Sequence, residues 1–170
     1  MRIVTAVVVA AAIAVAWTAV PVAQQSSQSS QSSHPSPLDE RGAHVMGFDQ
    51  QKTRHHFYLY ADGGAIDVSA NDPDDATNIA AARAHLPHIA KMFGEGDFAA
   101  PVLVHATNVP GTADLARLKD RLSYRYEETP RGGRVNIVTA DPDAIAALHR
   151  FLRFQITDHH TGDSPDVRPR

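Results

Sequence analysis

The sequence predicts an α+β fold, a two-layer sandwich in which a mainly antiparallel sheet of about five strands has helices on one face. Residues 63–74 are echoed by residues 132–143, and each copy runs from Gly-Gly through alternating apolar residues to Asp-Pro. This pattern is typical of a strand followed by a capped helix, and an alternating segment precedes each pair of glycines. We interpret the copies as a duplicated ββα unit in the order ββα-βα-ββα.

The chain divides into four segments. Residues 1–23 combine a basic start with an apolar run, which predicts a signal peptide or an N-terminal anchor. Residues 24–37, rich in Ser and Gln, are expected to be a disordered linker because they offer little apolar area to bury. Residues 38–162 are expected to form a single domain, and residues 163–170 a disordered tail. The location expected is periplasmic or secreted, with membrane contact only through an uncleaved N-terminal segment.

Composition excludes several classes of protein. The chain contains no cysteine, so disulfides, thiol catalysis and iron–sulfur clusters are excluded. The formal net charge is −3, and loss of the first 23 residues would remove Arg2 and no acid. Because an acidic domain is a poor binder of phosphate backbones, nucleic acid is not an expected partner.

The first hairpin is predicted from alternating residues in 55–60 and 65–70. A two-residue turn at Asp62-Gly63 would pair Phe57 with Val68 on a buried face. In the second hairpin, the corresponding turn at residues 131–132 would give the same register relative to the glycines.

The remaining elements follow from helix signals and apolar runs. Each Asp-Pro, at Asp72 and at Asp141, predicts a helix N-terminus, and Pro87 is expected to kink the first helix. Residues 101–105 are predicted to be a buried strand, and residues 112–119 a short helix.

Ten histidines are the compositional excess that suggests chemistry. His85 and His88 lie three residues apart on a predicted helix, with Met92 one turn further on and His105 at the end of the predicted central strand. Imidazole and thioether ligands suit copper, and imidazole alone suits zinc. The alternative is that these residues are structural. Met92 would then fill a gap in the core, and His85 and His88 lack the glutamate of a complete metal motif.

His55 and His56, at the start of the first hairpin, are further candidates to complete the metal set. The alternative for His55 is structural, because it faces the core and would then be a hydrogen-bonded interior residue. His159 and His160 follow the last helix, where a cation stabilises the helix dipole.

Two further regions are candidates for binding. His56, Tyr58 and Tyr60 share the open face of the predicted sheet, which could hold a small ligand, a protein partner or a second copy in a homodimer. The loop expected at residues 44–53 has no clear period and offers Met46, Asp49 and Lys52 as contacts. The alternative for this loop is a lead-in segment that Val45 and Phe48 pin to the core.

Five short stretches, spread over most of the expected domain, have a distinctive sequence. They are His44-Val-Met-Gly-Phe-Asp-Gln, Lys52-Thr-Arg-His-His-Phe, His85-Leu-Pro-His-Ile-Ala-Lys-Met-Phe, Gly132-Gly-Arg-Val and Phe151-Leu-Arg-Phe-Gln-Ile. Together they resemble a family of exported bacterial proteins of unknown activity. Members of that family are sometimes labelled aspartate carbamoyltransferase, but this chain lacks that enzyme's Ser-x-Arg-Thr-Arg phosphate loop.

No catalytic constellation is recognisable, since no serine lies in a G-x-S-x-G turn and the glycine pairs precede strands. The sequence therefore predicts an exported binding or accessory domain of unknown ligand in preference to an enzyme. The alternatives are a copper or zinc protein and an enzyme of unknown reaction.

Overall fold

The computed structural model describes residues 36–170, so the predicted signal segment and residues 24–35 of the linker lie outside the described part of the chain. The elements in chain order are α1 (Pro37–Met46), β1 (Thr53–Tyr60), β2 (Gly63–Ala70), α2 (Ala76–Gly94), α3 (Ala99–His105), α4 (Thr112–Arg117), the 3-10 helix η1 (Lys119–Arg121), β3 (Ser123–Thr129), β4 (Gly132–Val138) and α5 (Pro142–Asp158). Within residues 36–170, no helix is both long and apolar enough to cross a membrane.

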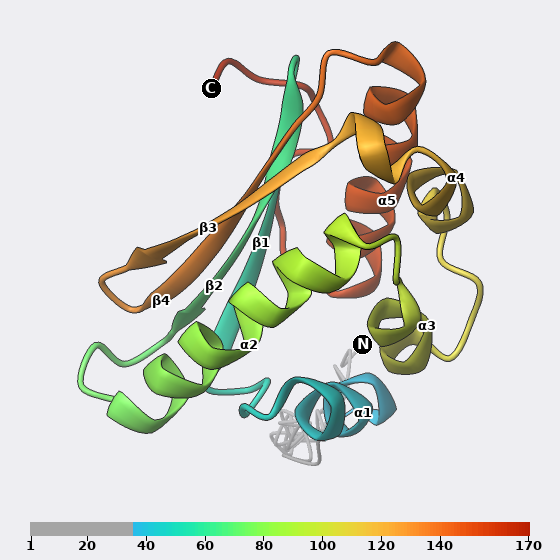
Figure 1. Ribbon diagram of the computed structural model, residues 1–170. Coiled ribbons are helices and arrows are strands. Elements are labelled where there is room, and N and C mark those ends of the chain that lie inside the picture. Colours follow the sequence, from blue (N-terminus) through green and yellow to red (C-terminus); the bar gives the residue numbers. More distant parts are fainter. Residues whose placement is uncertain (1–35) are drawn as a thin grey trace, which may run out of the picture. The chain divides into compact units, whose positions relative to one another are not determined.

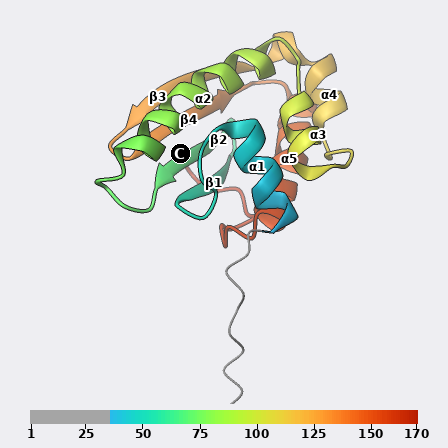
Figure 2. The same ribbon diagram turned by 90° about the horizontal axis from the view of Figure 1, so that it is seen from below.

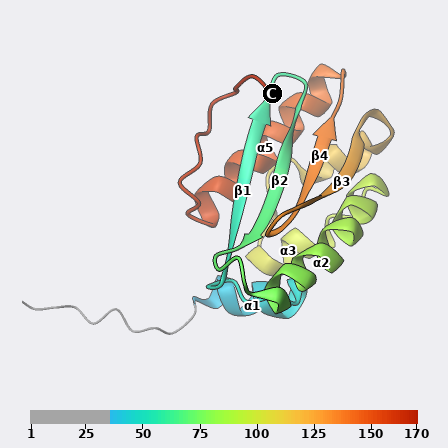
Figure 3. The same cartoon turned by 90° about the vertical axis from the view of Figure 1, so that its left-hand side faces the viewer.

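The strands form one antiparallel sheet in the order β1-β2-β4-β3. The long helices α2 and α5 cover one face of this sheet, and the other face has no helix over it (Figure 1, Figure 3). The predicted α+β two-layer architecture is therefore confirmed.

The sheet has four strands because residues 101–105, predicted to be a strand, belong to helix α3. Asp97 accepts a hydrogen bond from the backbone N–H of Ala99 at the start of this helix. Pro101, Val104 and His105 are buried, whereas Val102 and Leu103 are 37% and 61% exposed. Burial at positions i, i+3 and i+4 is the helical period, which a short apolar run does not distinguish from a strand by composition.

The first hairpin has the predicted faces but a different register. Phe57 pairs with Ile66 and His55 with Val68, a shift of two residues from the predicted pairing. Because the side-chain period of a strand is two, this shift keeps the apolar side chains on the buried face. The second hairpin is shifted equally, since Tyr126 pairs with Val135.

The glycines cause the shift because they lie in the strands and not in the turns. Gly63 has φ +144°, and a Cβ there would lie 2.0 Å from the backbone oxygen of Ile137. A Cβ at Gly132 would lie 2.0 Å from the oxygen of Val68. The glycines therefore allow β2 and β4 to approach closely. Both hairpins have the same register relative to their glycines, while the duplication itself stays a prediction.

The helix starts agree with the sequence at α5 and at α4, which begins at Thr112, and they differ at α1 and α2. Asp141 caps α5 and Pro142 is its first residue, as predicted. Helix α2 begins three residues after Pro73, is capped by Asp75 and is continuous through Pro87. Ser36, in the expected linker, forms a capping box that starts α1, and this helix ends at Met46, inside the loop expected at residues 44–53.

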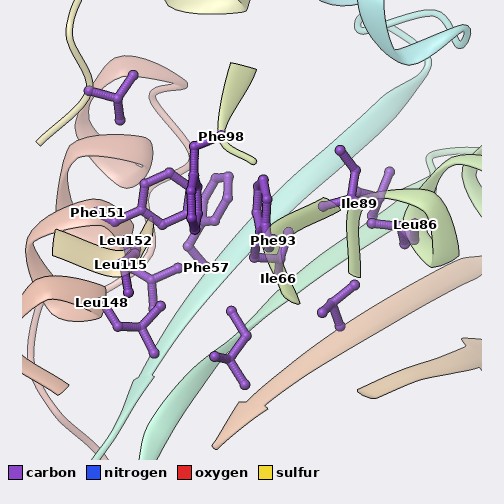
Figure 4. Close-up of a cluster of buried hydrophobic side chains, with 14 of the residues drawn as sticks. Phe57, Ile66, Leu86, Ile89, Phe93, Phe98, Leu115, Leu148, Phe151 and Leu152 are labelled. Carbon is purple, nitrogen blue, oxygen red and sulfur yellow. The ribbon is translucent and has the colours of Figure 1, made fainter. Parts of the chain in front are cut away.

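The core lies between the sheet and the helices (Figure 4). Phe93 of α2 stacks on Phe98 with ring centroids 4.5 Å apart and meets Phe151 of α5 edge-on at 5.9 Å. Helices α1 and α3 lie side by side at one end of this core (Figure 2). Arg41 Nε donates to the Val104 carbonyl across their contact at 2.7 Å.

The C-terminal residues, expected to be a disordered tail, run along the free edge of β1 (Figure 3). Arg168 N–H donates to the Leu59 carbonyl at 3.0 Å, and Arg168 forms a parallel bridge with Tyr60. The difference has a physical reason: this polar segment is held by hydrogen bonds and cation–π contacts and buries little apolar area. We call residues 161–170 the strap.

Candidate functional site

Four histidines from separate parts of the chain line one cavity of about 60 Å³. They are His55 of β1, His85 of α2, His105 at the end of α3 and His159, which follows α5. Most of the other residues that line this cavity are apolar. We call it the histidine cavity.

The imidazole rings contact one another and the neighbouring aromatic residues. His159 lies between two of them, 5.1 Å from His55 in a stacked arrangement and 4.9 Å from His105 edge-on. Phe48 lies 5.6 Å from His85 and 5.7 Å from His55, measured between ring centroids. The rings therefore form a connected cluster that four different segments position.

Three of the four rings are neutral at physiological pH. Burial, with a smaller contribution from the neighbouring His159, lowers the pKa of His55 to about 3. Burial also lowers the pKa of His85 and of His159 to about 4. A neutral imidazole has one nitrogen lone pair, so these rings can accept a hydrogen bond or bind a metal ion.

His105 is held by two residues of α5. Its Nδ1 lies 2.5 Å from Asp158 Oδ2, and its Nε2 lies 2.9 Å from Gln155 Oε1. The two contacts fix the orientation of the ring against α5. Within residues 36–170, the buried Nε2 of Gln155 has no hydrogen-bond partner, although Gln155 lines the cavity.

A second, polar cavity of about 250 Å³ adjoins the histidine cavity. His55 and His159 line both cavities. The polar cavity is otherwise lined by Asp39, Gln50, Thr53, Arg54, His56, His160 and Thr161. The stacked His55–His159 pair thus forms a wall between the polar cavity and the apolar one.

The predicted open-face residues lie on the other side of the sheet, where the strap contacts all three. His56 Nδ1 is 2.9 Å from Asp163 Oδ1. The guanidinium of Arg168 lies 4.0 Å from the centroid of the Tyr58 ring, and that of Arg170 lies 4.6 Å from the Tyr60 ring. A ligand, or a second copy in the suggested homodimer, would meet the strap at this face.

The predicted loop residues separate into two groups. Met46, the last residue of α1, lines the histidine cavity. Asp49 and Lys52 are exposed in the segment that leads to β1, where their charged atoms are 4.0 Å apart. The structure therefore brings only Met46 to the histidines.

The proposed metal ligands are only partly brought together. His85 and His105 line the cavity, whereas His88 is exposed and Met92 packs against the hydrophobic core. Within residues 36–170, no group of three or more His, Cys, Asp or Glu side chains is arranged to hold a metal ion.

Three residues of the site were not singled out by sequence reasoning. His159 was given a structural role at a helix terminus, although it is the central ring of the cluster. Gln155 and Asp158 lie three residues apart on α5, and both bond to His105. The available signal was the clustering of polar residues in 155–160, after the amphipathic part of the helix.

Comparison with known proteins gave no match to a family model, to a curated protein or to a solved structure.

Proposed function

We propose that this chain is an exported binding or accessory domain and that the histidine cavity is its ligand site. The observation that carries the proposal is the convergence of four histidines from separate segments on one cavity. A concave, mainly apolar pocket with a few convergent polar groups is the usual form of a small-molecule site. The resemblance to exported bacterial proteins supports the location and brings no activity.

The cavity favours a small ligand that has a hydrogen-bond acceptor. An apolar cavity of about 150 Å³ can hold benzene, so about 60 Å³ suits a smaller molecule or one end of a larger one. The free Nε2 of Gln155 would donate to an acceptor atom, and the neutral rings of His55 and His159 would accept from a donor.

Filling the cavity tests the proposal. Ala100 lines it and the neighbouring Ala99 is exposed, so Ala100→Phe should block the site while Ala99→Phe leaves it open. Native mass spectrometry of the protein isolated from a bacterial periplasm should show a bound small molecule in the wild type and in Ala99→Phe but not in Ala100→Phe. Equal occupancy in all three would place the ligand elsewhere.

Copper or zinc binding is the second candidate, and Met46 favours it. A thioether beside neutral imidazoles is a ligand set for copper, and imidazoles alone suit zinc. Because no three-residue ligand group is in place within residues 36–170, an ion would be bound by fewer protein ligands or after side-chain rotation. Titration with copper(I) and zinc should give about one ion per chain, lost in His85→Ala and retained in His88→Ala. Binding that both variants retain would reject His85 as a ligand.

A further inference from the structure

The wall between the two cavities is formed by His55, which lies inside a strand, and by His159, which lies at the end of a helix. His55 lies within β1, where the backbone is paired with β2 along its length. His159 follows the last residue of α5, and its N–H donates to the Gln155 carbonyl at 3.0 Å. His160 and Gly162 then adopt left-handed conformations with φ 50° and 75°. The chain turns sharply here, so His159 lies at the junction of helix and strap.

The strap is anchored beside His55. Asp163 Oδ1 bonds to His56 Nδ1, and Asp163 Oδ2 accepts from the backbone N–H of Phe57, both at 2.9 Å. These two residues directly follow His55 in the sequence. One carboxylate therefore ties the start of the strap to the strand that carries His55.

The end of the strap is held over the tyrosines of β1. Arg168 lies over Tyr58, and Arg170 lies over Tyr60 and 3.2 Å from the Asp62 carboxylate. Arg153 of α5 adds a hydrogen bond to the Pro165 carbonyl at 3.0 Å. These contacts set the path of the strap from the helix to the far end of β1 (Figure 3).

The strap is suited to opening without unfolding of the domain. Every residue from Ser164 to Arg170 is exposed, and an exposed cation–π contact stabilises by about 0.5–1 kcal/mol. Segments with few buried apolar contacts open locally at a fraction of the free energy of global unfolding.

We propose that the strap is a latch for the histidine cavity. When docked along β1, it holds His159 against His55 and so closes the wall between the polar cavity and the histidine cavity. When released, the turn after α5 is free to move and His159 leaves the wall, which joins the two cavities. This regulatory role rests on the proposed function of the cavity as a ligand site.

The latch can be tested by the reactivity of His159 toward diethyl pyrocarbonate, which modifies accessible neutral imidazoles. In Asp163→Ala/Arg168→Ala, which removes the tie to β1 and the contact with Tyr58, we expect the modification rate of His159, read by peptide mass spectrometry, to rise about fivefold or more. His88, exposed on α2, should react at an unchanged rate. Arg131→Ala, which removes an exposed arginine of the other hairpin, is the matched control. An unchanged His159 rate in the double variant would overturn the proposal.

A reversible lock gives a test that does not depend on the stability of the double variant. Tyr60 and Arg168 are bridge partners, and strand-pair spacing of about 4.8 Å lies within the range that a disulfide spans. Because the chain has no cysteine, Tyr60→Cys/Arg168→Cys can form only this bond within one molecule, and oxidation in dilute solution followed by isolation of the monomer removes disulfide-linked dimers. His159 should react slowly in the oxidised protein and quickly in the reduced one. Equal rates would overturn the latch.

These measurements use no ligand, so the latch and the ligand site can fail separately. If the reactivity of His159 is unchanged but Ala100→Phe blocks ligand binding, only the latch is rejected. A rise in His159 reactivity, with no ligand found in the histidine cavity, would support the latch and reject the cavity as a ligand site.

Discussion

His55 and His159 stack with their ring centroids 5.1 Å apart and their planes inclined by 26°. The stack joins β1 to the turn after α5 and divides the polar cavity from the apolar one. The pKa values of about 3 and about 4 keep both rings neutral above mildly acidic pH. Protonation of both rings would place two cations in contact, so acid weakens the stack.

The free energy of unfolding should fall as the pH falls from about 6.5 to about 4. In the unfolded chain, His55, His85 and His159 bind protons near their ordinary pKa of 6.5. In the folded chain, the same three residues stay neutral over this pH range. The unfolded state therefore binds more protons, and acid favours it. Urea unfolding at several pH values should show this slope, with a shallower slope in His159→Gln. His44→Gln is the control and should keep the wild-type slope, since His44 is exposed on α1 and lines neither cavity.

Asp158 stabilises the buried ring of His105, so Asp158→Asn should destabilise the fold. The His105 side chain is 1% exposed and that of Asp158 is 41% exposed, which means that solvent screens only one partner. We expect a loss of about 1–2 kcal/mol in urea unfolding at neutral pH. Asp120→Asn, at a side chain that is 87% exposed, should change the stability by less than about 0.5 kcal/mol. An equal effect of the two changes would show that the His105 contact adds nothing.

Gly63 should not tolerate a side chain. In Gly63→Ala the new Cβ would lie 2.0 Å from the Ile137 oxygen, so β2 and β4 must move apart. We expect a loss of at least about 2 kcal/mol, measured by chemical denaturation. Gly94→Ala is the opposite case, because its nearest neighbour would be at 3.8 Å at the end of α2, and alanine should stabilise by up to about 1 kcal/mol. Stabilisation by Gly63→Ala would contradict the close approach of the strands.

The sequence predicted the faces of the sheet better than its register. Alternation placed Phe57 and Ile66 on the buried face, which a two-residue shift does not change. The register of the hairpin depends on whether Gly63 lies in the turn or in the strand. Gly63 lies in the strand because the backbone of Ile137, on the neighbouring strand, leaves no room for a side chain there. A contact between strands that are distant in the sequence leaves no mark in the local pattern.

The candidate site was predictable only in part, because it too depends on contacts between segments that are distant in the sequence. His85 and His105 were named from the histidine excess, yet His105 belongs to a helix and not to a strand. His159 looked like a charge at a helix end because nothing local indicates that β1 passes beside it. The strap looked disordered because its stability comes from Tyr58 and Tyr60, which lie about 100 residues earlier in the chain.

Removal of the Tyr124 hydroxyl should not destabilise the fold, in contrast to the substitutions at Asp158 and Gly63. Within residues 36–170, this buried oxygen has no hydrogen-bond partner, and burial raises the pKa of the phenol. Because an unpaired buried hydroxyl loses its hydration and gains nothing in return, Tyr124→Phe should be neutral or stabilise by up to about 1 kcal/mol in chemical denaturation. Thr139→Val is the control, because the Thr139 hydroxyl donates to the Arg121 carbonyl at 2.7 Å and its loss should destabilise by about 1–3 kcal/mol. If Tyr124→Phe lost as much as Thr139→Val, an ordered water would have to pair with the phenol, and that side of the core would be hydrated.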